Sequence, residues 1–88
     1  MLKIEFAKSF KKSYQKLNQK EKELFENISL RLANNETLEA KYKDHALKGD
    51  FIGFRECHLK PDLLLIYQIQ DDKLVLYCLD IGSHSELF

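Results

Sequence analysis

The sequence predicts an α+β fold in which helices pack on one face of a mostly antiparallel sheet. Three observations predict it: an alternating apolar stretch at the start, two stretches with helical periodicity after it, and three apolar segments separated by turn signals at the end. The predicted order is strand, helix, helix, strand, strand, strand. With 88 residues, the chain is expected to form one domain, residues 1–88, with two layers around a single core.

The first half of the chain is predicted to begin with a short strand and an amphipathic helix. Residues 2–6, with the sequence LKIEF, alternate apolar and polar side chains as a half-buried strand does. Phe10, Tyr14 and Leu17 then recur at the spacing of one helical face. The opposite side of this helix carries a basic stripe, formed by Lys8, Lys12 and Lys16.

A second helix is predicted to follow the first almost without a loop, giving a helical hairpin. Asn18 and Glu21 have the spacing of a capping box, in which each side chain accepts from a free backbone amide at the helix start. Asn34 and Asn35 are expected to end the helix. Its apolar face would consist of Leu24, Phe25, Ile28 and Leu32. The segment Glu36–Asp50 shows no clear period and is predicted to be a long loop.

The second half of the chain is predicted to form a three-stranded antiparallel meander. Its strands are Phe51–Cys57, Asp62–Gln70 and Lys73–Ile81, which are rich in apolar, aromatic and β-branched residues and separated by the turn-like sequences KPD and QDDK. Cys57 and Cys78 fall inside strands without the spacing of a metal or redox motif. We expect them to be buried free thiols.

Composition excludes two broad classes of protein. A hydrophobic content of 44% is too high for a disordered chain. No apolar run approaches the ~18 residues of a membrane span, and the first residues lack the apolar stretch of a signal peptide, so a cytoplasmic protein is expected. Net charge is zero, yet residues 1–43 hold ten basic and six acidic residues and the remainder four and eight. Such asymmetry can mark a surface that faces a polyanion, although lysine-rich helix faces are usually only solvated.

All three histidines fall near the ends of predicted elements. His45 is expected in the loop before the meander, His58 at the turn between its first two strands, and His84 after its last strand. A meander can bring such positions to one end of a sheet. Taken singly, each histidine is more often a surface or interface residue, and no two of them share the close spacing of zinc ligands. No metal or other cofactor is therefore predicted, and acid–base chemistry is the more attractive role because imidazole titrates near neutrality.

Several other residues near the histidines are candidates for the same site. Asp62 lies across the Lys60-Pro61 turn from His58, where it could orient that ring or simply shape the turn. Arg55 could grip phosphate in a forked geometry, or form an ion pair with Glu56 or Asp80. Strand alternation places Arg55 and His58 on opposite faces, so a bulge or an early strand end would be needed for both to serve one site. Lys48 and Lys60 are further candidate cations for this site, although each is more simply interpreted as a lysine exposed to solvent.

Two aromatic residues could stack on RNA bases. Phe88, at the end of the sequence GSHSELF, offers a bare ring, and Tyr42 offers another, although core packing is favoured for Tyr42.

The sequence YKDHALKGDFIGFRECHLKPDLLLIY, followed by IGSHSELF, resembles the YafQ branch of the RelE/ParE superfamily of bacterial type II toxins. The resemblance covers residues 42–88 well, and the helical half agrees in layout. It rests on an Asp-His-x-Leu-x-Gly loop, an Arg followed three residues later by His, a Pro-Asp pair, and a terminal Gly-x-His-x-x-Leu-Phe. It implies the RelE-like two-layer fold.

The function that this resemblance implies is a metal-independent endoribonuclease that cleaves mRNA, typically on the translating ribosome. A cognate antitoxin, expected to be a ribbon-helix-helix protein, would hold it inactive in a toxin–antitoxin hetero-oligomer. The family's catalytic residues match His45, His58, Asp62, His84 and Phe88, and Arg55 matches the arginine of its motif. His45 is the candidate base, His84 the candidate acid, and His58 with Asp62 would position groups or transfer protons.

The chain departs from the family pattern at two positions. Leu63 replaces an aromatic residue after Pro-Asp, and Asp80 replaces an arginine two residues before the terminal Gly. An acid near the scissile phosphate would oppose charge stabilisation.

Two alternative functions remain: a ParE-like toxin that inhibits a protein such as gyrase, and a non-catalytic interaction module. The histidines and the terminal Phe argue against inhibition of gyrase, which offers no use for them. The terminal segment is expected to be ordered and packed near Arg55 and His58, with Gly82 turning the chain out of the last strand.

Overall fold

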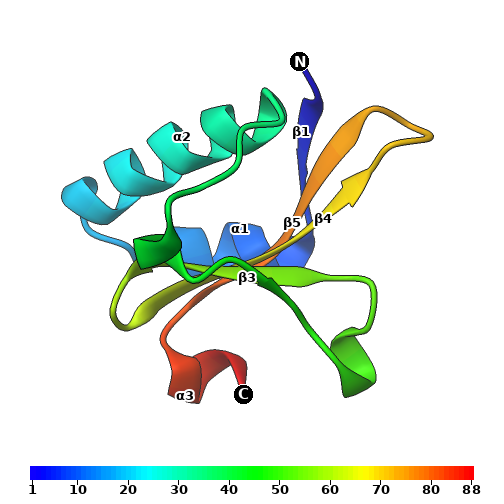
Figure 1. The fold of residues 1–88 in the computed structure, drawn as a ribbon. Helices are drawn as coiled ribbons and strands as arrows, with labels where there is room; N and C mark the ends of the chain where they lie inside the picture. The colour runs from blue at the N-terminus through cyan, green and yellow to red at the C-terminus, as the bar shows by residue number, and fades with distance from the viewer.

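A five-stranded mixed sheet forms the centre of the computed structural model, which describes residues 1–88 (Figure 1). Its strand order is β1-β5-β4-β3-β2, and only β1 and β5 are parallel. The strands are β1 Lys3–Phe6, β2 His45–Ala46, β3 Arg55–Lys60, β4 Leu63–Gln70 and β5 Val75–Gly82. The predicted α+β class and the meander β3-β4-β5 are confirmed. The sheet is larger than a three-stranded meander because β1 extends it beyond β5 and β2 extends it beyond β3.

The predicted helical hairpin is confirmed as α1, Lys8–Tyr14, and α2, Gln19–Ala33. The capping box is present: the Glu21 amide donates to Asn18 Oδ1 at 2.8 Å, and the Asn18 amide donates to Glu21 Oε1 at 3.0 Å. Helix α2 ends where Asn35 takes a positive φ of 60°, a conformation that asparagine tolerates better than most residues. None of the helices is long and apolar enough to cross a membrane.

The main core lies between this hairpin and one face of the sheet. Phe10, Phe25, Ile28 and Leu32 supply the helical side, and Cys57, Leu59, Leu65, Tyr67, Leu76, Cys78 and Ile81 supply the sheet side. Burial raises the pKa of both cysteine thiols to about 12, so they stay protonated at neutral pH. The prediction of buried free thiols is confirmed.

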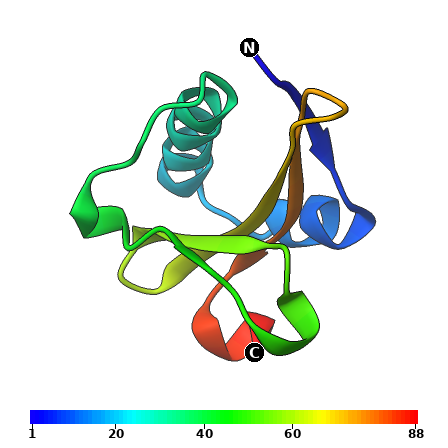
Figure 2. The same ribbon diagram turned by 45° about the vertical axis from the view of Figure 1, so that its right-hand side comes forward.

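The other face of the sheet is covered by fewer and shorter elements than the face that packs against the hairpin. Leu64 and Ile66 are both 1% exposed, yet they lie outside the main core cluster. Because side chains alternate along a strand, they point away from the hairpin. The turn η2, Gly49–Phe51, and the terminal helix α3, His84–Leu87, lie on this side, at the lower edge of Figure 2. The sequence GSHSELF therefore folds as part of the molecule.

Two predicted boundaries in the middle of the chain are wrong. The segment Glu36–Asp50 contains the turn η1, Ala40–Tyr42, and the strand β2 in addition to loop. The strand predicted at Phe51–Cys57 begins only at Arg55, because Gly49 and Gly53 have φ values of 66° and 91° that close a turn before it. It then runs on to Lys60, so His58 lies within β3 and not in the turn.

Candidate functional site

A buried carboxylate lies between two of the histidines. The Glu56 side chain is only 7% exposed, and its Oε1 atom is 3.6 Å from His45 Nε2 and 3.4 Å from His58 Nε2. His45, in β2, is the cross-strand partner of Glu56, in β3. His58 follows Glu56 by two positions in the same strand. Paired residues and residues two apart share one face of a sheet. Strand geometry therefore gathers the three groups on the face opposite the helical hairpin.

The His45 ring is held in one orientation by the backbone. Its Nδ1 is 2.6 Å from the carbonyl oxygen of Lys43. A carbonyl can only accept, so Nδ1 must carry the proton that it donates. In the neutral ring the free lone pair is then on Nε2, the nitrogen that faces Glu56. His45 is thus oriented to accept a proton at Nε2, and the Glu56 carboxylate lies where it would stabilise the resulting positive charge.

Glu56 was missed as a site residue by sequence reasoning, which considered it only as an ion-pair partner of Arg55. It stands between Arg55 and Cys57 in a strand and belongs to no recognisable motif. The available signal was its spacing from His58, since two residues two apart in a strand lie on the same face. That signal depended on knowing that β3 continues through His58.

His84, Phe88 and Asp62 form a second group around α3. The His84 backbone amide donates to Asp62 Oδ1 at 3.1 Å, which fixes the start of the helix to the β3–β4 turn. The Phe88 ring packs edge-on against Phe51, with ring centroids 5.5 Å apart, and lies 5.1 Å from the His84 ring. Asp62 was expected to act on His58. Its hydrogen bond goes instead to His84.

The two groups lie on the same side of the sheet. Leu64 pairs with His58 on one side and with Gly82 on the other. With strands spaced about 4.8 Å apart, the backbones of His58 and Gly82 are about 10 Å apart. Gly82 leads directly into α3, and a Cβ placed there would lie 3.0 Å from Glu86 Oε1, so the close approach of α3 favours glycine. His84 thus begins α3 two strands away from His58, on the same side of the sheet.

Arg55 is not brought to this site. The irregularity in the β3–β4 pairing falls between His58 and Lys60, so residues 55–58 alternate normally and Arg55 faces the helical side with Tyr67. Its Nε donates to Asp44 Oδ1 at 3.2 Å, and the Tyr67 hydroxyl donates to the same oxygen at 2.7 Å. Burial and this hydrogen bond raise the pKa of Tyr67. The expected ion pair with Glu56 or Asp80 is wrong, since Asp44 takes that place.

The two candidate lysines differ in their surroundings. Lys48 is exposed between β2 and η2. Lys60 lies at the end of β3 and pairs with Glu21 of α2, with 2.9 Å between Nζ and Oε2. This side of the turn belongs to the helical face. No group of three or more His, Cys, Asp or Glu side chains is arranged to hold a metal ion.

Comparison with known proteins identifies the family. Residues 2–88 match the family model described as "Bacterial toxin of type II toxin-antitoxin system, YafQ". The chain belongs to the YafQ toxin family. An mRNA interferase toxin YafQ from Escherichia coli strain B is 33% identical over 88 residues, covering 97% of this chain and 94% of that protein.

Solved structures of bacterial toxins have the same fold. A metal-bound toxin from Helicobacter pylori is 46% identical, with a TM-score of 0.88 and complete coverage of both chains. YafQ in the Escherichia coli DinJ-YafQ complex is 34% identical, with a TM-score of 0.80 over 100% of this chain and 99% of that one. The chain spans only 59% and 64% of the length of two further YafQ relatives, from Haemophilus influenzae and Escherichia coli K12.

The two departures from the YafQ pattern have structural explanations. Leu63 is 3% exposed and belongs to the main core, so it cannot stack on a base. Asp80 accepts from the Ser13 hydroxyl at 2.7 Å and from the Ile81 amide at 2.8 Å. These bonds hold its carboxylate against Ser13 of α1. Asp80 therefore has a structural partner in this chain.

Proposed function

We propose that the protein is a type II toxin that cleaves mRNA as a metal-independent endoribonuclease, acting in association with the ribosome. The observation that carries this proposal is the placement of His45, Glu56 and His58 on the same face of the sheet as α3 with His84. Such an arrangement offers proton acceptors and donors on one surface. Membership of the YafQ family and the name mRNA interferase of the Escherichia coli relative support it.

The chemistry is an in-line attack of a ribose 2′-hydroxyl on the adjacent phosphorus. In our assignment His45 Nε2 removes the hydroxyl proton, and the new bond from the 2′-oxygen to phosphorus forms as the bond to the 5′-oxygen breaks. His84 protonates that leaving oxygen. The products are a 2′,3′-cyclic phosphate and a free 5′-hydroxyl. Glu56 would stabilise the positive charge on His45, His58 would position groups or transfer protons on the other side of that carboxylate, and Asp62 would hold His84 in place.

Sequencing RNA ends after induction in bacteria tests this function. New 5′-hydroxyl ends in messages, with matching cyclic phosphates, are expected, and purified protein with ribosomes should produce them in the presence of EDTA. Intact messages together with DNA damage would favour inhibition of gyrase. Normal growth without the antitoxin would favour an interaction module.

An antitoxin is the partner that we propose for the helical half. An apolar groove of about 620 Å³ lies between β1, α1 and α2, and its lining includes Phe6, Phe10 and Leu30. Phe6 is 40% and Leu30 49% exposed. Lys11 of α1 lines the groove, and Lys8 and Lys12 are exposed on the same helix, so an amphipathic acidic segment that covers the groove and crosses α1 would fit. The DinJ-YafQ complex of the related Escherichia coli protein supports this partner.

Charge reversal at Lys8 and Lys12 of α1, and at Lys16 just after it, should weaken antitoxin binding. The triple variant Lys8→Glu, Lys12→Glu, Lys16→Glu is expected to bind the cognate antitoxin at least about tenfold more weakly, and the loss should shrink at high salt. Isothermal titration at two salt concentrations measures both effects. Undiminished affinity would exclude the electrostatic part of the proposal.

Glu56→Gln is expected to slow RNA cleavage by about tenfold to a hundredfold, as for other groups that orient a functional histidine. The amide keeps the shape of the side chain but removes the negative charge that faces both imidazoles. The pH dependence of the rate should change as well, which a purely structural role would not produce. Glu23→Gln on the exposed side of α2 is the matched control. A wild-type rate in Glu56→Gln would contradict the assignment.

Asp62 offers a test that separates positioning from proton transfer. Asp62→Asn should retain most of the activity, because an amide oxygen can still accept from the His84 backbone amide. Asp62→Ala should lose about tenfold, since that backbone amide loses its partner and α3 frays. RNA cleavage assays on both variants decide the question. Equal loss in both would show that Asp62 acts through its charge or its proton.

A further inference from the structure

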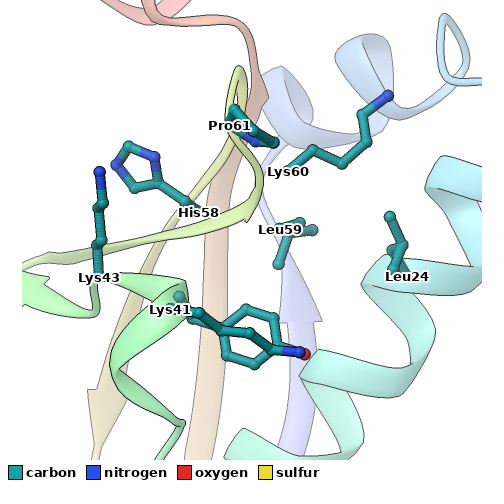
Figure 3. Close-up of a pocket in the computed structure, with 8 residues that line it drawn as sticks. Leu24, Lys41, Lys43, His58, Leu59, Lys60 and Pro61 are labelled. Carbon is teal, nitrogen blue, oxygen red and sulfur yellow. The ribbon is translucent and has the colours of Figure 1, made fainter.

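A pocket lined by lysines lies beside the proposed catalytic residues. It has a volume of about 440 Å³ and opens between α2, η1 and the β3–β4 turn (Figure 3). Its polar lining comes from Lys41, Lys43, Lys60, Tyr42 and His58. No acidic side chain is among the lining residues. We call it the lysine pocket.

The positive charge of the lysine pocket is only partly neutralised. Lys60 pairs with Glu21, and the pKa of Glu21 is lowered by its hydrogen bond from the Asn18 amide and by Lys60, so this pair stays charged. Lys41 and Lys43 form no ion pair. The Lys41 ammonium lies 5.1 Å from the centre of the Tyr42 ring, and its charge contributes to lowering the pKa of Glu39 without forming an ion pair with it. Two lysine ammonium groups that form no ion pair therefore line the pocket.

Lys43 connects the lysine pocket to the proposed catalytic site. It is a non-glycine residue in the left-handed region, with φ of 48°, a conformation that costs about 1 kcal/mol or more. Its carbonyl fixes His45, while its side chain lies beside the His58 ring at the mouth of the pocket (Figure 3). One backbone conformation thus sets both the catalytic histidine and a pocket cation. His58 lines the pocket and also contacts Glu56.

We propose that the lysine pocket is an RNA subsite that holds the nucleotide next to the cleaved bond. Lys41 and Lys43 would contact its phosphates, and the Tyr42 and Pro61 side chains would contact its base or sugar. Phosphate contacts by lysine give salt-dependent affinity without sequence specificity. The subsite rests on the proposed ribonuclease function and gives it a path for the RNA on the α2 side of His58.

Binding of a fluorescent single-stranded RNA with 2′-O-methyl groups tests the subsite, because this probe lacks the attacking hydroxyl. The variant Lys41→Gln, Lys43→Gln should bind it about tenfold more weakly than wild type. The slope of log affinity against log salt should fall by about 1.4, as for two lost phosphate contacts on a single strand. Lys3→Gln, Lys73→Gln removes the same charge from exposed positions in β1 and the β4–β5 turn and should bind normally. Thermal melting confirms that both variants fold.

The possible results separate the subsite from the ribonuclease function. Wild-type affinity in the pocket variant, or no binding of the probe by wild type, would overturn the subsite even if wild type cleaves mRNA. Probe binding that depends on Lys41 and Lys43 in a protein that cleaves no RNA would support the subsite and overturn the ribonuclease. Equal losses of RNA affinity in the two double-lysine variants would also overturn the subsite, because the lysines would then contribute only through general charge.

Discussion

His58→Ala and His84→Ala are each expected to reduce RNA cleavage by at least about a hundredfold, and the double variant should show none above background. Groups that transfer protons in a transition state contribute about 10²–10⁴ to the rate. The two rings lie on one side of the sheet and come from different elements, β3 and α3, so neither can replace the other without moving the backbone. Cleavage of labelled mRNA on ribosomes and growth after induction measure the effect.

A loss of fold must be separated from a loss of chemistry in these variants. Removing His58 takes a partner from the buried Glu56 carboxylate, and a buried charge without a partner is destabilising. His58→Gln keeps a hydrogen-bond donor there but cannot transfer protons. It should be inactive, fold normally and bind antitoxin with wild-type affinity. A fully toxic double variant, or a His58→Gln variant with normal cleavage, would refute the catalytic roles.

Most of the fold could be predicted because its signals are local. The capping box at Asn18 depends on residues three apart, and the apolar face of α2 on a period of 3.6. Strand β2 could not be predicted in this way, since its two residues are both exposed and the strand is defined by its pairing with Arg55 and Glu56. The late start of β3 depends on two glycines with positive φ, which the sequence permits but does not require.

The site was predicted less completely, because it depends on which side chains share a face. Sequence order identified the histidines near element ends, and alternation showed that Arg55 and His58 conflict. In the structure the two side chains do lie on opposite faces of the sheet, since Arg55 is bound to Asp44 on the helical side. Glu56 became visible only when β2 placed His45 opposite it. Register between distant strands is a tertiary property, so no local pattern could supply it.

Phe88→Ala is expected to reduce RNA cleavage by about 5- to 150-fold with little change in stability. Stacking of a base on an aromatic ring contributes about 1–3 kcal/mol, which corresponds to that range. Phe88 is 53% exposed, and its ring pairs with the rings of Phe51 and His84, so its removal should cost less than about 1 kcal/mol in unfolding free energy. Ribosomal cleavage assays and chemical denaturation give the two quantities.

The substituents at this position separate stacking from packing. Phe88→Tyr keeps an aromatic face and should retain activity, whereas Phe88→Leu keeps apolar contact with Phe51 and should resemble Phe88→Ala. Ile52→Ala, which removes a side chain in a residue that is 77% exposed and adjoins Phe51, is the control and should leave both quantities unchanged. Full activity of Phe88→Leu would mean that the ring only anchors α3. A fall in stability as large as the fall in activity would mean the same, because the main role of the terminal helix would then be structural.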